Sequence, residues 1–314
     1  MAVFTKLQVS DFQQILTSYN IGEYINNSEI SDGIENTNYI LNTSTDRYIF
    51  TIYENRTNLN DLPYFLELKE YLSKNNFNCP VPIRDKNNNL FNYYNEKPYA
   101  IISFLEGKNI KEPSLDNISK AARKLAELHL CSQKENHLHR KNSLSIDFWK
   151  ETYAKITKKN KQEFAGLKEA ITQGFEIIDK NWPENLPVGI IHGDYFPDNV
   201  MLKENGEISG IIDFYMAAND ILAYDLAIMI NAWCFEKDFS FNREKLQNLL
   251  GNYNSIRSLS EAEYAALPIL LVGASIRFLV TRLYDYFNQK KGVKVSVKDP
   301  REYLAKLRFH LNQL

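Results

Sequence analysis

GIIHGDYFPDNVMLKENGEISGIIDF, from Gly189 to Phe214, is the stretch of sequence that decides the fold. A short aliphatic run leads into the polar loop HGDYFPDN, and two further apolar runs follow, separated by the turn-forming residues ENGE. Short apolar runs bounded by turn residues are typical of buried strands. The stretch therefore predicts a strand, a polar loop and a buried hairpin, with Asp213 at the end of the last apolar run.

The chain before this stretch is rich in strand patterns. The runs TNYIL (37–41) and RYIFTIY (47–53) are separated by NTSTD, a turn-forming spacer that favours a hairpin. The segment 60–75 carries leucine and phenylalanine at helical spacing, with Asp61 as the expected helix cap. A further strand is expected over YAIISFLEG (99–107). Residues 1–103 are therefore predicted to form an antiparallel sheet with one helix.

The chain after residue 104 is mostly helical. The segment DNISKAARKLAELHL (116–130) places apolar residues on one helix face, and helices are also expected within residues 148–180 and 261–288. No repeat of fixed period is present, which argues against a solenoid. The sequence predicts an α+β protein with a small antiparallel sheet lobe (1–103) and a larger helical lobe (104–314) that carries the polar loop.

Composition and charge narrow the class of protein. The 314 residues have a formal net charge of -2 and no basic stripe, so no nucleic-acid partner is expected. Cys79, Cys131 and Cys234 have no paired spacing, which argues against a disulfide framework and fits a reducing compartment. The first residues lack a signal-peptide pattern, and no uninterrupted apolar run reaches membrane-spanning length. A cytoplasmic protein without a membrane partner is predicted, and the sequence carries no signal for its oligomeric state.

The polar loop carries the residue types that phosphoryl transfer requires. One carboxylate must orient the attacking hydroxyl and accept its proton, and an amide oxygen with a second carboxylate can hold Mg²⁺. Asp194 suits the first role, while Asn199 and Asp213 suit the second, because the offset from Asp194 to Asn199 matches the D-x-x-x-x-N spacing of kinase loops. Each aspartate alone is better explained as a turn or cap residue, so the interpretation depends on their order and strand context.

HGDYFPDN followed by IIDF resembles the signature of the aminoglycoside phosphotransferase and choline kinase superfamily, whose fold is protein-kinase-like. The resemblance extends over nearly the whole chain, and it implies ATP and Mg²⁺ as cofactors, Asp194 as catalytic base and His192 as a scaffold of the loop. The segment AYDLA matches a further motif, in which Asp225 resembles a buried aspartate that holds the loop by hydrogen bonds. Taken alone, Asp225 would be a helix cap and His192 a core histidine.

The first lobe holds the residues that the resemblance implies for nucleotide binding. The turn SDGIENTNY precedes the strand RYIFTIYE where a phosphate-covering loop is expected, although its residue types alone indicate an ordinary hairpin turn. Thr51 stands where a phosphate-binding lysine is usual, so Arg47 or Arg56 is a candidate for that charge. The strand YAIISFLEG resembles the hinge that binds adenine through its backbone. The predicted nucleotide-binding residues are Gly33, Asn36, Thr37, Asn38, Thr51, Ile102, Ser103 and Phe104.

The flanks of the loop resemble one group of the superfamily, the homoserine kinases. The matching segments are IIDFYMAANDILAYDLAIMINAWCFE, GASIRFLVTRLYDYFN and KDPREYLAKLRFH. The resemblance implies transfer of phosphate from ATP to L-homoserine, giving O-phospho-L-homoserine for threonine biosynthesis. Because L-homoserine is a zwitterion, its pocket requires both a cation and a carboxylate or carbonyl group. The substrate candidates are Arg277, Arg282 and Asp285, for which a structural salt-bridge set is the alternative, and Tyr215, Asn231 and Trp233, for which core packing is the alternative.

Other functions stay open at this point. A kinase for another small alcohol, such as choline, an aminoglycoside or a sugar, would carry the same loop. Choline would need aromatic and acidic walls without a partner for a carboxylate, so the arginines favour homoserine. The missing strand lysine keeps open the alternative of a nucleotide-binding module without catalysis. A metal-dependent hydrolase is disfavoured, because the histidines lack the spacing of metal ligands.

Overall fold

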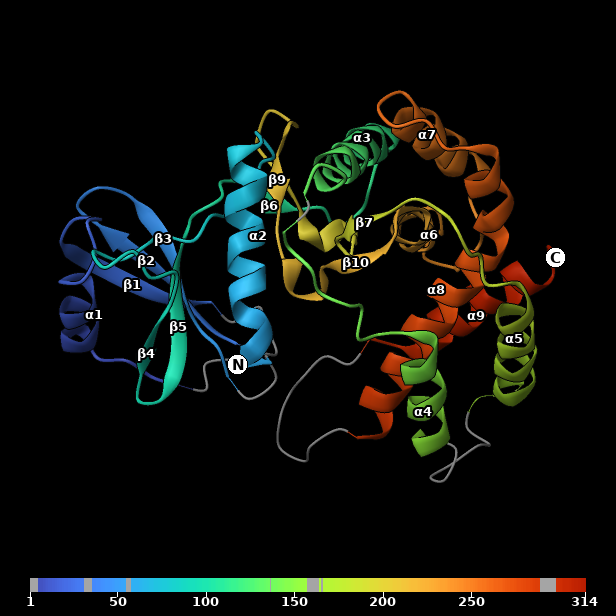
Figure 1. Cartoon of the computed structure of the whole chain (residues 1–314), viewed down its shortest axis with the longest axis horizontal. Helices are drawn as coiled ribbons and strands as arrows, with labels where there is room; N and C mark the ends of the chain where they lie inside the picture. Colours follow the sequence, from blue (N-terminus) through green and yellow to red (C-terminus); the bar gives the residue numbers. More distant parts are fainter. Residues whose placement is uncertain are drawn as a thin grey trace. The chain divides into compact units, whose positions relative to one another are not determined.

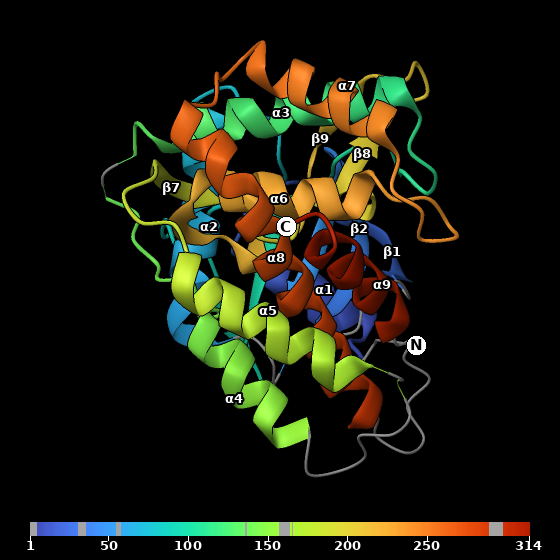
Figure 2. The ribbon, with the colours of Figure 1, turned by 90° about the vertical axis from the view of Figure 1, so that its right-hand side faces the viewer.

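The computed structural model describes residues 5–30, 36–54, 58–135, 137–156, 164, 166–288 and 298–314. These residues divide into two compact units. The first unit comprises Met1–Lys108 with two short pieces, Met201–Lys203 and Ser209–Ile212, and the second comprises the rest of the chain. Figures 1 and 2 show the elements of both units.

The first unit is built on a five-stranded antiparallel sheet in the order β1-β2-β3-β5-β4. The predicted hairpin is confirmed, since β2 and β3 pair from Thr37↔Ile52 to Asn42↔Arg47. Alternate side chains of β2 are buried, as expected for a strand with one face on a core. The elements are α1 (Val9–Leu16), β1 (Tyr24–Ile30), β2 (Thr37–Thr43), β3 (Arg47–Ile52), α2 (Leu62–Lys74), β4 (Asn92–Tyr94) and β5 (Lys97–Ser103).

Three elements of this unit, α1, β1 and β4, have no counterpart in the sequence prediction. Helix α1 packs on the sheet through Phe12, whose ring lies 5.3 Å from Tyr39 and 5.4 Å from Phe50. Strand β1 pairs with β2, and its side chains are exposed or only half-buried. This exposure explains why its sequence YINNSEI is mostly polar and was not recognised as a strand. The predicted strand 99–107 is shorter than expected, since β5 ends at Ser103. Helix α2 is confirmed and follows a short 3₁₀ turn, η1 (Leu59–Asp61).

The second unit is mostly helical, as predicted. Its helices α4, α5, α6, α8 and α9 share one hydrophobic core, and α3 lies beside α7 in both views of the ribbon (Figures 1 and 2). The predicted helical segment 148–180 is two helices, of which the second begins after Gly166. The helices are α3 (Leu115–Ser132), α4 (Ile146–Ile156), α5 (Leu167–Asn181), α6 (Leu222–Trp233), α7 (Arg243–Asn254), α8 (Glu261–Phe287) and α9 (Pro300–Leu311).

Strands from the deciding stretch join two different sheets. Strand β7 (Val188–Ile191) pairs antiparallel with β10 (Ala218–Ile221), while β8 (Val200–Leu202) and β9 (Ile208–Ile211) are neighbours in a sheet with β6 (Lys108–Asn109). The predicted hairpin is therefore β8 and β9. The pairing of β7 with β10 was not predicted, because the sequence ANDI of β10 has no extended β-prone run. The 3₁₀ turns η2 (Pro197–Asn199) and η3 (Phe214–Met216) complete this region.

Helix α8 runs through the core of the second unit. It is long and apolar enough to cross a membrane by length and composition, but 67% of its most apolar window is buried inside the protein. Its contacts with α4, α5, α6 and α9 explain that composition, because a helix surrounded by other helices is apolar on most of its surface. The apolarity of α8 is therefore that of a core helix.

The last helix contributes a buried histidine that makes stability depend on pH. The Nε2 of His310 lies 2.7 Å from Oδ1 of Asn231, and burial, together with the charge of Lys306, lowers the pKa of His310 to about 3. Between pH 6.5 and about pH 3, His310 is protonated in the unfolded chain and neutral in the folded chain. Acid therefore lowers the unfolding free energy by about 1.4 kcal/mol per pH unit in that window. Urea unfolding at pH 7, 6 and 5 gives the slope of the unfolding free energy against pH. This slope should be smaller by one proton in His310→Gln than in the wild-type protein. The exposed His137→Gln is the control, and equal slopes in all three proteins would contradict the assignment.

Candidate active site

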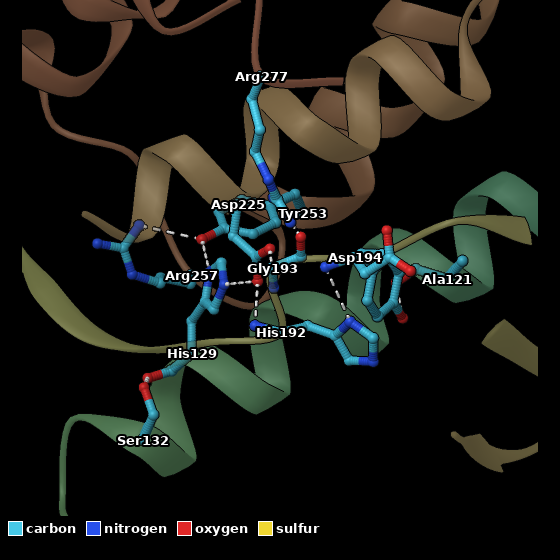
Figure 3. Close-up of polar contacts among 11 residues, drawn as sticks. Ala121, His129, Ser132, His192, Gly193, Asp194, Asp225, Tyr253, Arg257 and Arg277 are labelled. Atoms are coloured by element: carbon cyan, nitrogen blue, oxygen red, sulfur yellow. Dashed lines mark hydrogen bonds and ion pairs between the residues drawn. The ribbon is translucent and has the colours of Figure 1, made fainter. Parts of the chain in front are cut away.

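The polar loop follows β7 and turns sharply at Gly193. This glycine has φ +76°, and a Cβ there would lie 2.7 Å from the carbonyl oxygen of Met216. Both observations require glycine, since other residues rarely adopt this conformation and none has room for a side chain. The turn presents Asp194 as the next residue, with a partly exposed side chain (Figure 3). The glycine of HGD thus allows the sharp turn that directs the Asp194 carboxylate outward from a buried strand.

Asp225 anchors the loop from helix α6. Its Oδ2 accepts the backbone N–H of His192 at 2.7 Å, and its Oδ1 accepts that of Gly193 at 2.9 Å (Figure 3). The carboxylate is fully buried. Burial by itself would raise the pKa of Asp225, but the hydrogen bonds from His129 and from the His192 backbone hold the pKa below its usual value. Asp225 is therefore an anion in the core, bonded to the loop as the family resemblance implies.

A chain of buried polar groups continues behind Asp225. The Nε2 of His129 on α3 lies 3.1 Å from Asp225 Oδ2, and its Nδ1 lies 2.6 Å from the hydroxyl of Tyr253 on α7. Arg257 donates to that hydroxyl at 3.2 Å and to Glu263 of α8 at 2.8 Å. The sequence identified none of the last three residues, because only the packing of α3, α7 and α8 brings them together.

The direction of each hydrogen bond in this chain follows from charge. Burial lowers the pKa of His129, and Asp225 offsets that shift only in part, so the imidazole is neutral. Its Nε2 then carries the proton that faces the Asp225 anion, and its Nδ1 accepts the proton of Tyr253. The Tyr253 oxygen in turn accepts from Arg257. Every donor therefore faces an acceptor from Arg257 to the loop.

His192 is enclosed within the loop itself. Its side chain is fully buried, with its ring centroid 4.8 Å from that of Phe214 and 5.5 Å from that of Tyr195. Its Nδ1 accepts the backbone N–H of Asp194 at 3.2 Å. The imidazole therefore holds the backbone at Asp194 and has no access to solvent, a geometry that suits the scaffold role expected from the sequence.

Asp194 and Asn199 lie together at the two ends of the loop. The Nδ2 of Asn199 donates to the backbone oxygen of Asp194 at 2.8 Å and to its Oδ2 at 3.2 Å. Both bonds use the amide nitrogen of Asn199, and its Oδ1 is the atom of this side chain that could ligate a metal ion. Asp213 is exposed, follows β9 and adopts a left-handed conformation (φ 64°, ψ 61°) as it opens η3.

These oxygens fit Mg²⁺ better than a transition metal. The donors are one amide oxygen and one accessible carboxylate, and Mg²⁺ characteristically takes one or two protein oxygens together with substrate phosphates and water. Among the residues that the structure describes, no group of three or more His, Cys, Asp or Glu residues is placed to hold a metal ion. The described residues therefore do not form a metal site of the kind built from three or more such side chains.

Two of the predicted substrate residues contact the loop backbone instead of solvent. Trp233 Nε1 donates to the carbonyl oxygen of Tyr195 at 2.8 Å, and the Arg277 guanidinium donates to the carbonyl oxygen of Gly193 (Figure 3). Both side chains are buried. Their spacing in the sequence gave no sign of this role, because each reaches the loop from a helix distant in the chain.

The other predicted substrate residues are dispersed. Asn231 is fully buried, and its amide donates to Leu271 and Ser275 and accepts from His310. Arg282 pairs at 2.6 Å with Glu302 of α9, and its guanidinium lies 4.4 Å from the ring centroid of Tyr303. Asp285 is exposed and Tyr215 is half-buried. For Asn231 and Arg282 the contacts are those of the packing and salt-bridge alternatives.

The candidates for nucleotide binding lie in the first unit. Thr51 Oγ1 donates to Asn38 Oδ1 across the β2–β3 pair at 2.8 Å, and Thr37 Oγ1 donates to Glu54 at 2.8 Å. Asn36 Oδ1 accepts the backbone N–H of Glu54 at 3.3 Å. The four candidates Asn36, Thr37, Asn38 and Thr51 therefore cluster at one end of the β2–β3 hairpin. Gly33 and Arg56 lie outside the described residues.

Three further features of the first unit bear on the predictions. The backbone N–H of Ser103 donates to the carbonyl of Val81 at 2.8 Å, so in the predicted hinge Ile102–Phe104 this group is already used. Arg47 pairs with Glu106 and lies 4.2 Å from the ring centroid of Phe104. Lys69 of α2 is a buried cation that the sequence did not single out, because it lies among the apolar positions of that helix.

The two-unit α+β architecture with the anchored H-G-D loop is that of the protein-kinase-like fold class. Its similarity to solved structures supports that class. An amicoumacin kinase in complex with AMP-PNP and Ca²⁺ matches 98% of this chain and 94% of its own, with a TM-score of 0.73 and 14% identity. A choline kinase from Streptococcus pneumoniae matches 97% and 99%, with a TM-score of 0.66 and 15% identity. At these identities the likeness establishes the fold alone.

The chain belongs to the phosphotransferase enzyme family, whose model matches residues 27–259. A homoserine kinase from Agrobacterium fabrum is 43% identical over 310 residues, which cover 99% of this chain and 96% of that protein. The family that the motifs resemble and the predicted fold class are thereby confirmed, and the chain is a kinase.

Proposed function

We propose that the chain transfers the γ-phosphoryl group of ATP to the side-chain hydroxyl of L-homoserine, forming O-phospho-L-homoserine on the route to threonine in the cytoplasm. The observation that carries the proposal is the 43% identity to a homoserine kinase over nearly the full length of both proteins. The anchored loop is consistent with it, since positioning and electrostatics supply most of the catalysis in phosphoryl transfer.

Asp194 is the proposed base. Its side chain is partly exposed, while the backbone N–H groups of Asp194 and of the preceding Gly193 are held by His192 and Asp225. A carboxylate so fixed can accept a hydrogen bond from the acceptor hydroxyl, orient its oxygen toward the phosphorus and take its proton as the new bond forms. Asn199 supports that carboxylate through its Nδ2 and keeps its own Oδ1 for the metal.

Asn199 and Asp213 are the proposed protein ligands of Mg²⁺, which would neutralise charge on the phosphates when bound. In this assignment the left-handed backbone at Asp213 serves to direct an exposed carboxylate from the end of β9. Such a conformation is costly for a residue with a side chain, so its presence at a predicted functional position supports the role.

Nucleotide binding is assigned to the first lobe, residues 1–103, and acceptor binding to the remaining lobe, residues 104–314. Asn36, Thr37, Asn38 and Thr51, with Gly33, are proposed at the phosphates, and the backbone of Ile102 and Phe104 at adenine. Among the predicted acceptor residues, Tyr215 and Asp285 keep surface exposure, so they are the stronger candidates for contact with L-homoserine.

The proposal is tested by ADP release with Mg·ATP and a panel of acceptors: L-homoserine, choline, kanamycin, a methylated thiosugar and none. Turnover confined to L-homoserine is the expected result. Turnover of another alcohol instead would retain the kinase chemistry and reject the substrate. Absence of turnover with every acceptor would favour a nucleotide-binding module without catalysis.

A further inference from the structure

The side chain of Arg277, on helix α8, is 3% exposed and extends to the catalytic loop. Its Nη1 donates to the carbonyl oxygen of Gly193, and Figure 3 shows the extended side chain directed at the loop. That oxygen belongs to the peptide group between Gly193 and Asp194. The same peptide group donates its N–H to Nδ1 of His192 at 3.2 Å. Both polar ends of this one peptide are therefore bonded to side chains.

The preceding peptide is held in a similar way. Its N–H, on Gly193, donates to Oδ1 of Asp225 at 2.9 Å. Three side chains thus hold two successive peptide planes around a glycine whose φ is +76°. Glycine would otherwise be the most mobile residue of the loop. Because the plane of the Gly193–Asp194 peptide sets φ of Asp194, the bond from Arg277 bears directly on where the Asp194 carboxylate points.

Stability alone does not account for Arg277. Within the described part of the chain the guanidinium forms no ion pair, and its Nε is buried without a hydrogen-bond partner. Its other neighbours are the ring of Phe278, whose centroid lies 4.5 Å from the guanidinium carbon, and Tyr224, whose pKa it lowers against the effect of burial. The nearby carboxylate of Asp220 interacts with Arg277 only at a distance. Burial raises the pKa of Asp220, and the charge of Arg277 opposes that rise. A buried cation without an ion-pair partner costs free energy, and an apolar residue of similar length would serve the core at least as well. The arginine is therefore explained by what its Nη1 holds.

We propose that Arg277 is a positioning residue, which fixes the Gly193–Asp194 peptide and thereby orients the Asp194 carboxylate, and that it is not the receptor for the acceptor's carboxylate. This assignment rests on the proposed function only in taking Asp194 as the base. It differs from the role expected from the sequence, in which Arg277 was a candidate ligand for the carboxylate of L-homoserine.

The kinetic test uses Arg277→Met and Arg277→Lys with two acceptors, L-homoserine and 3-aminopropan-1-ol, which lacks only the carboxylate. For Arg277→Met we expect kcat to fall by about 10- to 100-fold with both KM values within about twofold of wild type, because misorientation of a catalytic group affects the reacting geometry. Arg277→Lys should recover part of kcat. The ratio of kcat/KM between the two acceptors should be unchanged. A raised KM for L-homoserine with collapse of that ratio would overturn the proposal and restore the carboxylate role.

A second measurement needs no acceptor and so separates this proposal from the proposed function. Hydrogen exchange of the Gly193 and Asp194 amides should be at least about tenfold faster in Arg277→Met, because local opening of the loop costs less there. Arg282→Met, which removes another buried arginine of α8, should leave these two amides at wild-type rates. If Arg277→Met does not fold, Arg277→Leu, which also lacks any hydrogen-bond donor, serves for the same comparison. Wild-type exchange in the folded Arg277 variant would overturn the proposal whichever alcohol the enzyme accepts.

Discussion

Replacement of Asp194 by asparagine is expected to lower kcat by about 10²- to 10⁴-fold, the range for loss of a general base. Asparagine has the same shape and can still accept the hydrogen bond from Asn199 Nδ2, so the loop should keep its fold. It cannot take the proton of the acceptor hydroxyl. The binding of Mg·ATP should therefore survive while turnover is lost.

The measurement pairs ADP release with titration of Mg·ATP by calorimetry. Asp213→Ala is the contrasting variant, because it removes a proposed metal ligand and leaves the base in place. We expect the affinity for Mg·ATP to fall in Asp213→Ala and to stay near wild type in Asp194→Asn. Loss of nucleotide affinity with retained turnover in Asp194→Asn would exchange the two roles.

Replacement of Asp225 by asparagine is expected to lower the unfolding free energy by about 3–5 kcal/mol, the range for breaking a buried charged contact. The carboxylate accepts three N–H groups, from His192, Gly193 and His129. An asparagine side chain has one acceptor oxygen and brings two donors of its own, so donors would face donors in a fully buried site. Turnover should fall as well, since the loop backbone loses its anchor.

Urea unfolding at neutral pH measures this effect. Asp179→Asn is the matched control, because Asp179 forms an ion pair with Lys150 at 2.6 Å in which both side chains are more than 40% exposed. Such a pair contributes about 1 kcal/mol or less. A similar small loss in Asp225→Asn would show that the anchor is dispensable for the fold.

The local motifs were predictable because their causes are local. HGDYFPDN and its flanking apolar runs specify the strand, the glycine turn and the residues Asp194 and Asn199 at the two ends of one loop. The hairpin of β2 and β3 was predictable for the same reason, since NTSTD ends one alternating run and begins another. The match of AYDLA to a family motif indicated Asp225, which lies in the first turn of α6 and accepts the backbone N–H of Gly193.

The partners supplied by distant helices were not predictable in this way. Spacing along α8 indicates which residues share a face with Arg277, but not that this face meets Gly193. Tyr253, Arg257 and Glu263 carry no motif, and their connection to His129 exists only through helix packing. The polar strand β10 was missed because its pairing with β7 is fixed by what surrounds it.

The buried polar chain from Arg257 to Asp225 also bears on how this enzyme tolerates sequence change. Each of its members has a single arrangement of donors and acceptors, so replacing one leaves its neighbour with an unmatched group. The costs of single replacements at 129, 253 and 257 should therefore be strongly non-additive. In a combinatorial library selected for activity, these three positions should change together or remain as they are, whereas the surface of α7 accepts substitutions one at a time.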